Sequence, residues 1–150
     1  MAQVFHQLYY HVVWTTKNRG PQLSEEVRPH LLDAIQQRCQ RLGSTLHALN
    51  AVEDHVHVAL EIPPSRAVST VVGQMKGASA HEINQLRSAS SHWQDGYGVV
   101  TFRQAELAKV KRYIDTQEER HRAGALSPVL ETWKGRDADR DGDGPANDDA

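Results

Sequence analysis

Two histidines separated by a single residue form the sharpest chemical feature of this sequence. His55 and His57 belong to the run DHVHVAL at residues 54–60. On a β-strand, residues two apart point to the same side, so both imidazoles project together, about 7 Å apart along the chain. Two imidazoles at that spacing suit a shared divalent metal ion. The pair alone is also compatible with ordinary exposed histidines on a half-buried strand.

A tyrosine and a glutamine form a second candidate set. Tyr113 and Gln117 lie four residues apart in a segment with helical periodicity, which stacks them on one helix face, one turn apart. A phenol can act as an oxygen nucleophile, and an amide oxygen can ligate a hard cation. The alternative is an amphipathic helix, with Tyr113 at the edge of the core and the neighbouring lysines and arginines on a solvated face.

The elements that must position these residues follow from hydrophobic periodicity and from turn residues. Strands are predicted at 4–15, 45–52, 54–62 and 99–102. Helices are predicted at 24–42, with a regular part that begins only near Pro29, from about 65 to 86, and from 105 to about 122. The order β-α-β-β-α-β followed by a helix is typical of an α+β, ferredoxin-like fold, with a mainly antiparallel sheet and helices on one face. Because the apolar residues of the histidine strand face those helices, we expect the histidines on the opposite, open face, available to a ligand or a second subunit.

Length and composition exclude several classes of protein. The chain has 150 residues, of which 24% are charged and 39% hydrophobic, so it is neither disordered throughout nor membrane-spanning. No secretory signal is recognisable at the N-terminus, and we therefore expect a soluble, cytoplasmic protein. A single cysteine, Cys39, excludes an internal disulfide framework and a cysteine-based zinc site.

The net charge of −2 conceals two unlike parts. Residues 137–150 hold six aspartates and one arginine, a charge of −5, whereas residues 1–136 hold 13 acids and 16 bases, a charge of +3. We predict a folded domain at 1–136, with its core at about 4–122, and an acidic, disordered tail at 137–150. The tail also contains the aspartate spacing that opens a calcium loop, but the flanking amphipathic helices are missing, which favours a solvated tail. The basic body suits a polyanionic partner.

Several motifs, taken in order, carry a resemblance to a known family. They are YYHVVWTTKNR at residues 9–19, the His-hydrophobic-His strand, Met75-Lys76-Gly77 in a valine-rich helix, WQDGYG at 93–98 and YIDTQEERHR at 113–122. Their order and spacing resemble the HUH single-tyrosine transposases of the insertion-sequence 200/605 class. The resemblance extends over about residues 9–122 and covers nearly all of the expected folded part.

The resemblance implies roles for individual residues. Tyr113 corresponds to the catalytic tyrosine, His55 and His57 to the metal-binding pair, and Gln117 to a third metal ligand. The implied metal is magnesium or manganese, and no nucleotide cofactor is implied. Members of this class act as homodimers on single-stranded DNA folded into hairpins at element ends. In several of them the tyrosine helix is exchanged between the two subunits.

The implied reaction is cleavage and rejoining of single-stranded DNA through a 5′-phosphotyrosine, without ATP. An alternative is a domesticated relative that binds or nicks chromosomal hairpins without moving an element, and a third reading is an unrelated metal-binding protein. The sequence offers no obvious general base, although Asp54 and His11 are candidates. Phosphate contacts are expected from Lys17, Arg19, Lys76, Arg103, Lys109 and Arg112, and base stacking from Trp14, Trp93 and Tyr97. Each of these residues could equally be an ordinary surface or core residue.

Overall fold

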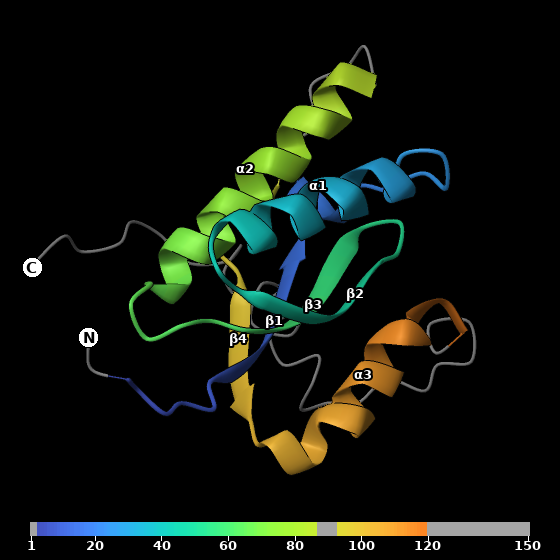
Figure 1. The fold of residues 1–150 in the computed structure, drawn as a ribbon. Helices are drawn as coiled ribbons and strands as arrows, with labels where there is room; N and C mark the ends of the chain where they lie inside the picture. The colour runs from blue at the N-terminus through green and yellow to red at the C-terminus, as the bar shows by residue number, and fades with distance from the viewer. Residues whose placement is uncertain (1–2, 87–92, 120–150) are drawn as a thin grey trace, which may run out of the picture.

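Four antiparallel strands form one sheet in the order β2-β3-β1-β4 (Figure 1). The computed structural model describes residues 3–86 and 93–119. The elements are β1 (Tyr9–Thr15), η1 (Lys17–Arg19), α1 (Arg28–Arg41), β2 (Thr45–Ala51), β3 (His55–Glu61), α2 (Val68–Leu86), β4 (Gly98–Phe102), η2 (Gln104–Glu106) and α3 (Leu107–Asp115). The predicted α+β fold class and the β-α-β-β-α-β order are confirmed.

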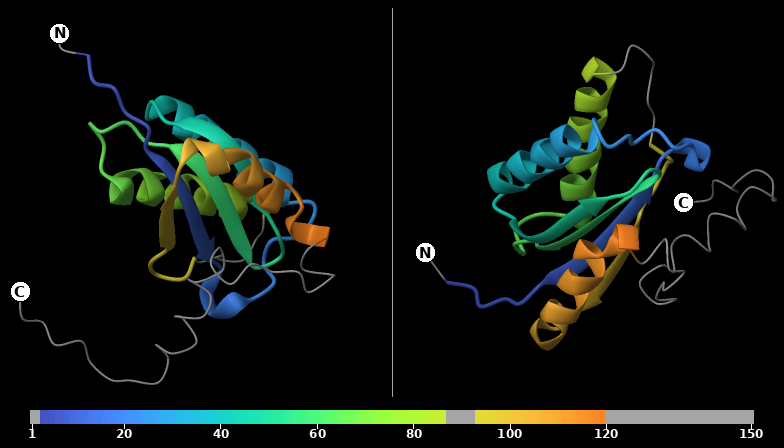
Figure 2. Two further views of the ribbon diagram at one scale, coloured as in Figure 1. Left: turned by 90° about the horizontal axis from the view of Figure 1, so that it is seen from below. Right: turned by 90° about the vertical axis from the view of Figure 1, so that its right-hand side faces the viewer.

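Alternation along the strands assigns each side chain to one of two faces of the sheet. Val12 and Trp14 of β1 lie beside Val56 and Val58 of β3 in the larger buried cluster, beneath α1 and α2. Both of these helices cover the same face (Figure 2). The residues of β3 that alternate with these valines, including both histidines, therefore point to the other face.

That other face is partly covered by α3, which packs on β2 and β3. Ala48 and Ala59 of the sheet contact Val110 and Ile114 of the helix in a second, smaller buried cluster. The two alanines allow the helix to approach the sheet closely, because their side chains are single methyl groups. The expectation of exposed histidines on an open face is therefore wrong: His55 and His57 are 0% and 1% exposed.

Boundaries differ from the predicted ones where local signals compete. The first strand begins at Tyr9 rather than at residue 4, and Phe5 is 87% exposed. The first helix begins at Arg28 and not at Ser24, as the position of Pro29 predicts, because the missing N–H of proline costs nothing in the first turn. It ends before Gly43, whose φ of 71° suits glycine at a helix terminus.

The last helix is interrupted within the described residues. A 3₁₀ turn, η2, precedes α3, which ends at Asp115; Thr116, with a φ of −108°, forms a turn, and residues 117–119 are again helical. Residues 120–150, and with them the predicted boundary at 136, the acidic tail and its calcium-like run, lie outside the described residues. In the described part of the chain, no helix has both the length and the apolar character needed to cross a membrane.

Candidate active site

The two histidines of β3 lie side by side beneath α3. In the antiparallel register, His57 pairs with Val13 of β1 and His55 pairs with Thr15. Their ring centroids are 4.9 Å apart, with an interplanar angle of 74°. Spacing along the strand therefore brings both imidazoles together, as the sequence predicts.

Each histidine is held at its Nδ1 atom by a neighbouring side chain. Nδ1 of His55 lies 2.6 Å from Oδ1 of Asp54, and Nδ1 of His57 lies 2.9 Å from Nε2 of His11. The His11 ring stacks on that of His57 at a centroid distance of 5.1 Å. When a proton resides on Nδ1, the lone pair of a neutral imidazole is on Nε2. In that tautomer, each histidine offers Nε2 to a ligand.

Tyr113 joins this cluster from α3. Its ring stands edge-on to His57, with centroids 5.9 Å apart, and edge-on to His11 at 6.4 Å. The tyrosine is 3% exposed. A side chain on the seventh residue of α3 therefore meets side chains from two strands that lie far from it in sequence.

Gln117 lies one turn beyond Tyr113 and is completely buried. Its amide nitrogen donates a hydrogen bond of 3.0 Å to the carbonyl oxygen of Tyr113. The next residue, Glu118, forms an ion pair of 3.0 Å with Arg28 at the start of α1. Since the amide nitrogen is engaged with the backbone, the carbonyl oxygen Oε1 is the atom of Gln117 suited to bind a cation.

The donor set is compatible with one divalent cation. Among the described residues, no three His, Cys, Asp or Glu side chains converge as a ligand set. Within residues 3–86 and 93–119, a third protein ligand beside His55 and His57 would be of another type, and the amide of Gln117 is chemically suitable. Histidine ligands commonly donate the proton of their other ring nitrogen to a carboxylate or another acceptor, as His55 can to Asp54.

Two predicted phosphate contacts stand at the edge of this site. Lys17 and Arg19 are exposed in η1, directly after β1. The backbone N–H of Thr16 donates 2.8 Å to the carbonyl of Asp54, which fixes this loop beside the start of β3. Lys17 and Arg19 thus lie at the same end of the sheet as His55.

Lys76 has a structural role that its sequence context did not indicate. Its Nζ donates to the carbonyl oxygens of Gln94 and Gly96, at 3.0 and 2.8 Å, and ties α2 to the following loop. Burial lowers the pKa of Lys76, while the carboxylate of Asp95 opposes that shift. The remaining predicted contacts are exposed; they are Arg103 before η2, and Lys109 and Arg112 on α3.

The predicted stacking residues are mostly in the core. Trp14 is 0% exposed and packs edge-on against Trp93, with ring centroids 5.9 Å apart, so a base cannot stack on Trp14. The indole N–H of Trp93 donates 2.9 Å to the carbonyl of Lys76. Trp93 and Tyr97 are half-buried against the main cluster.

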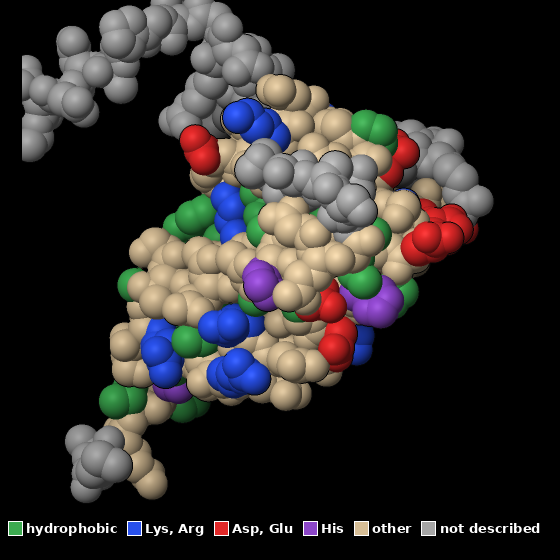
Figure 3. Space-filling model, turned by 90° about the horizontal axis from the view of Figure 1, so that it is seen from above, with side chains coloured by type: hydrophobic (Ala, Val, Ile, Leu, Met, Phe, Trp, Pro, Cys, Tyr) green, Lys and Arg blue, Asp and Glu red, His purple; other side chains and the backbone are tan. Residues whose placement is uncertain are grey.

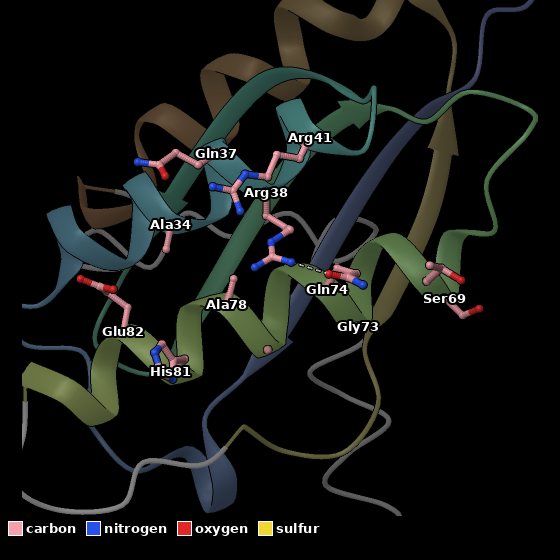
Figure 4. A pocket seen from close by; sticks show the side chains of 12 residues that line it. Ala34, Gln37, Arg38, Arg41, Ser69, Gly73, Gln74, Ala78, His81 and Glu82 are labelled. Atoms are coloured by element: carbon pink, nitrogen blue, oxygen red, sulfur yellow. Dashed lines mark hydrogen bonds between the residues drawn. The ribbon is translucent and has the colours of Figure 1, made fainter.

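A groove of about 580 Å³ is lined by residues of α1 and α2, the two helices that cover the face of the sheet opposite the histidines. Figure 4 shows Arg38 of α1 reaching across it to Gln74 of α2, at 2.8 Å. Figure 3 shows the molecule from above the view of Figure 1; basic and acidic side chains occur together on this surface. None of the predicted catalytic or metal-binding residues lines this groove.

Two residues beside the site have contacts that the sequence does not reveal. Asn50 of β2 donates 2.9 Å to the carbonyl of Ile114 and so anchors α3 beside Tyr113. No local pattern distinguishes it from any other polar strand residue. His11 was considered only as a proton acceptor, because its contact with His57 depends on the register between two strands 46 residues apart.

Comparison with known proteins assigns this chain to a family. Residues 4–117 match the family model described as "Transposase IS200 like". The ISDra2 transposase TnpA of Deinococcus radiodurans is 29% identical over 122 residues, which cover 77% of this chain and 87% of the relative. The transposase for insertion sequence element IS200 of Salmonella typhimurium is also 29% identical, over 77% of this chain and 80% of the relative.

Solved structures agree in fold. A putative transposase from Deinococcus radiodurans superposes with a TM-score of 0.62 and 27% identity, over 78% of this chain and 96% of that chain. A REP-associated tyrosine transposase, solved bound to a REP hairpin, has a TM-score of 0.59 over 81% of this chain and 74% of that chain; at 15% identity it supports the fold alone. Because the family model covers most of the chain, this protein belongs to the IS200-like transposase family.

Proposed function

We propose that this protein cleaves and rejoins single-stranded DNA at hairpin element ends, with Tyr113 as the nucleophile. The observation that carries the proposal is the contact between Tyr113 and His57, which joins the one phenol of α3 to the histidine pair of β3. A buried phenol beside two imidazoles is the combination that metal-assisted phosphoryl transfer to tyrosine requires.

The cleavage step forms one bond and breaks one. The phenolic oxygen of Tyr113 attacks the scissile phosphorus and loses its proton, forming a tyrosine–phosphate bond. The bond from phosphorus to the 3′ oxygen breaks, and that oxygen takes up a proton to become a free 3′-OH. The products are a 5′-phosphotyrosine and a 3′ end. Rejoining is the same exchange with another 3′-OH as the attacking group, so it needs no ATP.

We assign the metal ligands to Nε2 of His55, Nε2 of His57 and the amide oxygen of Gln117, with magnesium or manganese as the ion. When bound, the ion would polarise a phosphate oxygen and offset the charge that develops in the transition state. Asp54 and His11 hold the two imidazoles at Nδ1. Both candidates for the general base are therefore already engaged with the histidines.

DNA binding is assigned to exposed cations around the site. Lys17 and Arg19 at the end of β1, and Lys109 and Arg112 on α3, are the principal candidates for phosphate contacts. Arg103 is a further candidate, whereas the two backbone hydrogen bonds of Lys76 favour a structural role.

We further propose a homodimer. The strand β4 supports it, because it lies at the edge of the sheet that the described strands form, and its Val99 and Val100 are 41% and 37% exposed. In this chain Tyr113 contacts His57 of the sheet in the same chain. An exchanged helix would bring the same residues together from two chains.

A covalent-adduct assay tests the function. The protein is incubated with Mn²⁺ and a labelled DNA hairpin that carries single-stranded flanks, and the products are separated on a denaturing gel. We expect a labelled adduct for the wild type and none for Tyr113→Phe. Tyr9→Phe, which alters another buried tyrosine of the sheet, is the matched control and should retain the adduct. An adduct of equal yield with Tyr113→Phe refutes the proposal, as does its absence from the wild type on every hairpin.

A genomic observation separates transposition from a domesticated role. Palindromic ends flanking the coding region would indicate that the element is mobile. Their absence, together with a positive adduct assay, would favour an enzyme that acts on chromosomal hairpins.

A further inference from the structure

The hydrogen bond between His11 and His57 carries chemical information beyond packing. Nε2 of His11 lies 2.9 Å from Nδ1 of His57, and both residues are 1% exposed. Two neutral imidazoles can share such a bond in only two ways, because one nitrogen must donate and the other must accept. The direction of the bond therefore fixes which nitrogen of His57 carries its lone pair.

Only one direction is compatible with a ligand role for His57. If His57 offers Nε2 to a cation, its proton resides on Nδ1, which donates to Nε2 of His11. His11 then accepts, with its own proton on Nδ1. In the opposite direction the proton of His57 resides on Nε2, and this nitrogen has no lone pair for a metal.

We infer that His11 is a positioning residue that acts through His57, selecting the tautomer and ring orientation in which Nε2 can bind the metal. This inference rests on the proposed function. Asp54 holds His55 in the same way, with its Oδ1 atom 2.6 Å from Nδ1 of His55. Both proposed ligands are therefore held at Nδ1, His55 by a carboxylate and His57 by an imidazole. Ring stacking at 5.1 Å with an angle of 27° further restricts rotation of His57.

The geometry favours this role over two others. His11 is not a third ligand beside the histidine pair, since no three histidine, cysteine or acidic side chains of the described residues converge on one point. His11 is also not a stacking partner of Tyr113, because the two ring planes stand at 73° with centroids 6.4 Å apart, whereas Nε2 of His11 lies 2.9 Å from Nδ1 of His57. The tautomer-selecting role rests instead on the hydrogen bond between His11 and His57.

A near-isosteric pair of variants tests the inference. Glutamine and methionine have similar length and volume, but only the amide of glutamine can accept a strong hydrogen bond from Nδ1 of His57. We therefore compare His11→Gln with His11→Met, and use His47→Gln as a control, because His47 pairs with Glu61 outside the site. Thermal unfolding verifies that each variant is folded.

Two readouts do not depend on catalysis. The ¹⁵N chemical shifts of the imidazoles in the metal-free protein report the tautomer, and the EPR signal of unbound Mn²⁺ reports the affinity. We expect His57 protonated at Nδ1 in the wild type, His11→Gln and His47→Gln, and a mixture of tautomers in His11→Met. Mn²⁺ affinity should fall by about 10- to 100-fold in His11→Met, the usual effect of removing a partner of a metal ligand, and should be retained in His11→Gln.

Each outcome either supports or overturns the inference. Unchanged tautomer and affinity in His11→Met would overturn it, as would a His11→Gln variant as defective as His11→Met. A wild type that binds no Mn²⁺ overturns it together with the metal assignment. A wild type that binds Mn²⁺ but forms no DNA adduct refutes the proposed function, while the two readouts still decide the role of His11.

Discussion

The side-chain amide of Asn50 in β2 donates a hydrogen bond of 2.9 Å to the carbonyl oxygen of Ile114 in α3. Ile114 directly follows Tyr113, so this bond fixes the helix at the residue where the chemistry is proposed. The Oδ1 atom of Asn50 also accepts a hydrogen bond from the backbone N–H of Ala51. A single strand residue thus couples the position of the proposed nucleophile, Tyr113, to the sheet that carries the histidines.

Replacing Asn50 by alanine should loosen α3 without removing any reacting group. The change removes the hydrogen-bond partner of the Ile114 carbonyl and of the Ala51 N–H. We therefore expect the unfolding free energy, measured by denaturant titration, to fall by about 1–3 kcal/mol. The yield of the DNA adduct should fall, because Tyr113 is held less firmly beside His57. Full adduct yield at that reduced stability would show that Asn50 matters only for folding.

Substituting alanine for His55 should separate cleavage from DNA binding. Loss of a metal ligand should reduce cleavage by at least about 100-fold, the scale seen when one group that stabilises transition-state charge is removed. Hairpin affinity, measured by fluorescence anisotropy, should remain close to that of the wild type, because phosphate contacts elsewhere supply most of it. His47→Ala is the matched control. A parallel loss of cleavage and affinity in His55→Ala would indicate a purely structural histidine.

Much of this arrangement was predictable because it is local. Alternation on β3 places His55 and His57 on one face, and helical spacing places Tyr113 and Gln117 one turn apart. The burial of Trp14 was predictable too, since it lies two residues after Val12 and must share the core face. The sequence contains that signal, although indole chemistry suggested base stacking instead.

What the sequence did not reveal depends on long-range packing. Alternation cannot tell whether the polar face of a strand is covered, and here α3 covers it because Ala48 and Ala59 are small. The contact between His11 and His57 likewise depends on the antiparallel register of β1 with β3. Neither relationship leaves a periodic pattern in the chain.

Gln117 should be tested with leucine and glutamate. Leucine has a similar size but no oxygen, so Gln117→Leu should weaken Mn²⁺ binding on the order of tenfold and reduce the adduct yield. Glutamate supplies a carboxylate oxygen, which suits a hard cation, and Gln117→Glu should retain Mn²⁺ binding. Equal Mn²⁺ affinity in Gln117→Leu and the wild type, by EPR titration, would remove Gln117 from the ligand set.

Arg19 combines a strained backbone with a position at the edge of the site. Asn18 and Arg19 have φ values of 56° and 54°, a left-handed conformation that glycine adopts readily and arginine does not. Arg19→Gly should therefore raise the unfolding free energy by about 0.5–1 kcal/mol, after the larger backbone entropy of glycine in the unfolded chain is subtracted. DNA affinity should fall, because a cation is lost.

The matched variant for this experiment is Arg19→Ala. It removes the same charge but keeps a side chain that is strained at this φ, so DNA affinity should fall equally while stability does not rise. Thermal unfolding and anisotropy at two salt concentrations measure both quantities. Unaltered affinity in both variants, with the salt dependence unchanged, would exclude Arg19 from the DNA contacts.

Removing residues 137–150 should leave cleavage intact, because every assigned catalytic residue precedes them. The deletion takes away a charge of −5 and leaves +3, so association with DNA should strengthen at low salt and differ little at high salt. A second variant, with the six aspartates replaced by asparagine, keeps the length and should behave as the deletion does. Added Ca²⁺ should not change the melting temperature of the full chain. Loss of adduct formation in the deletion, or a calcium-dependent rise in melting temperature, would instead make this segment part of the functional domain.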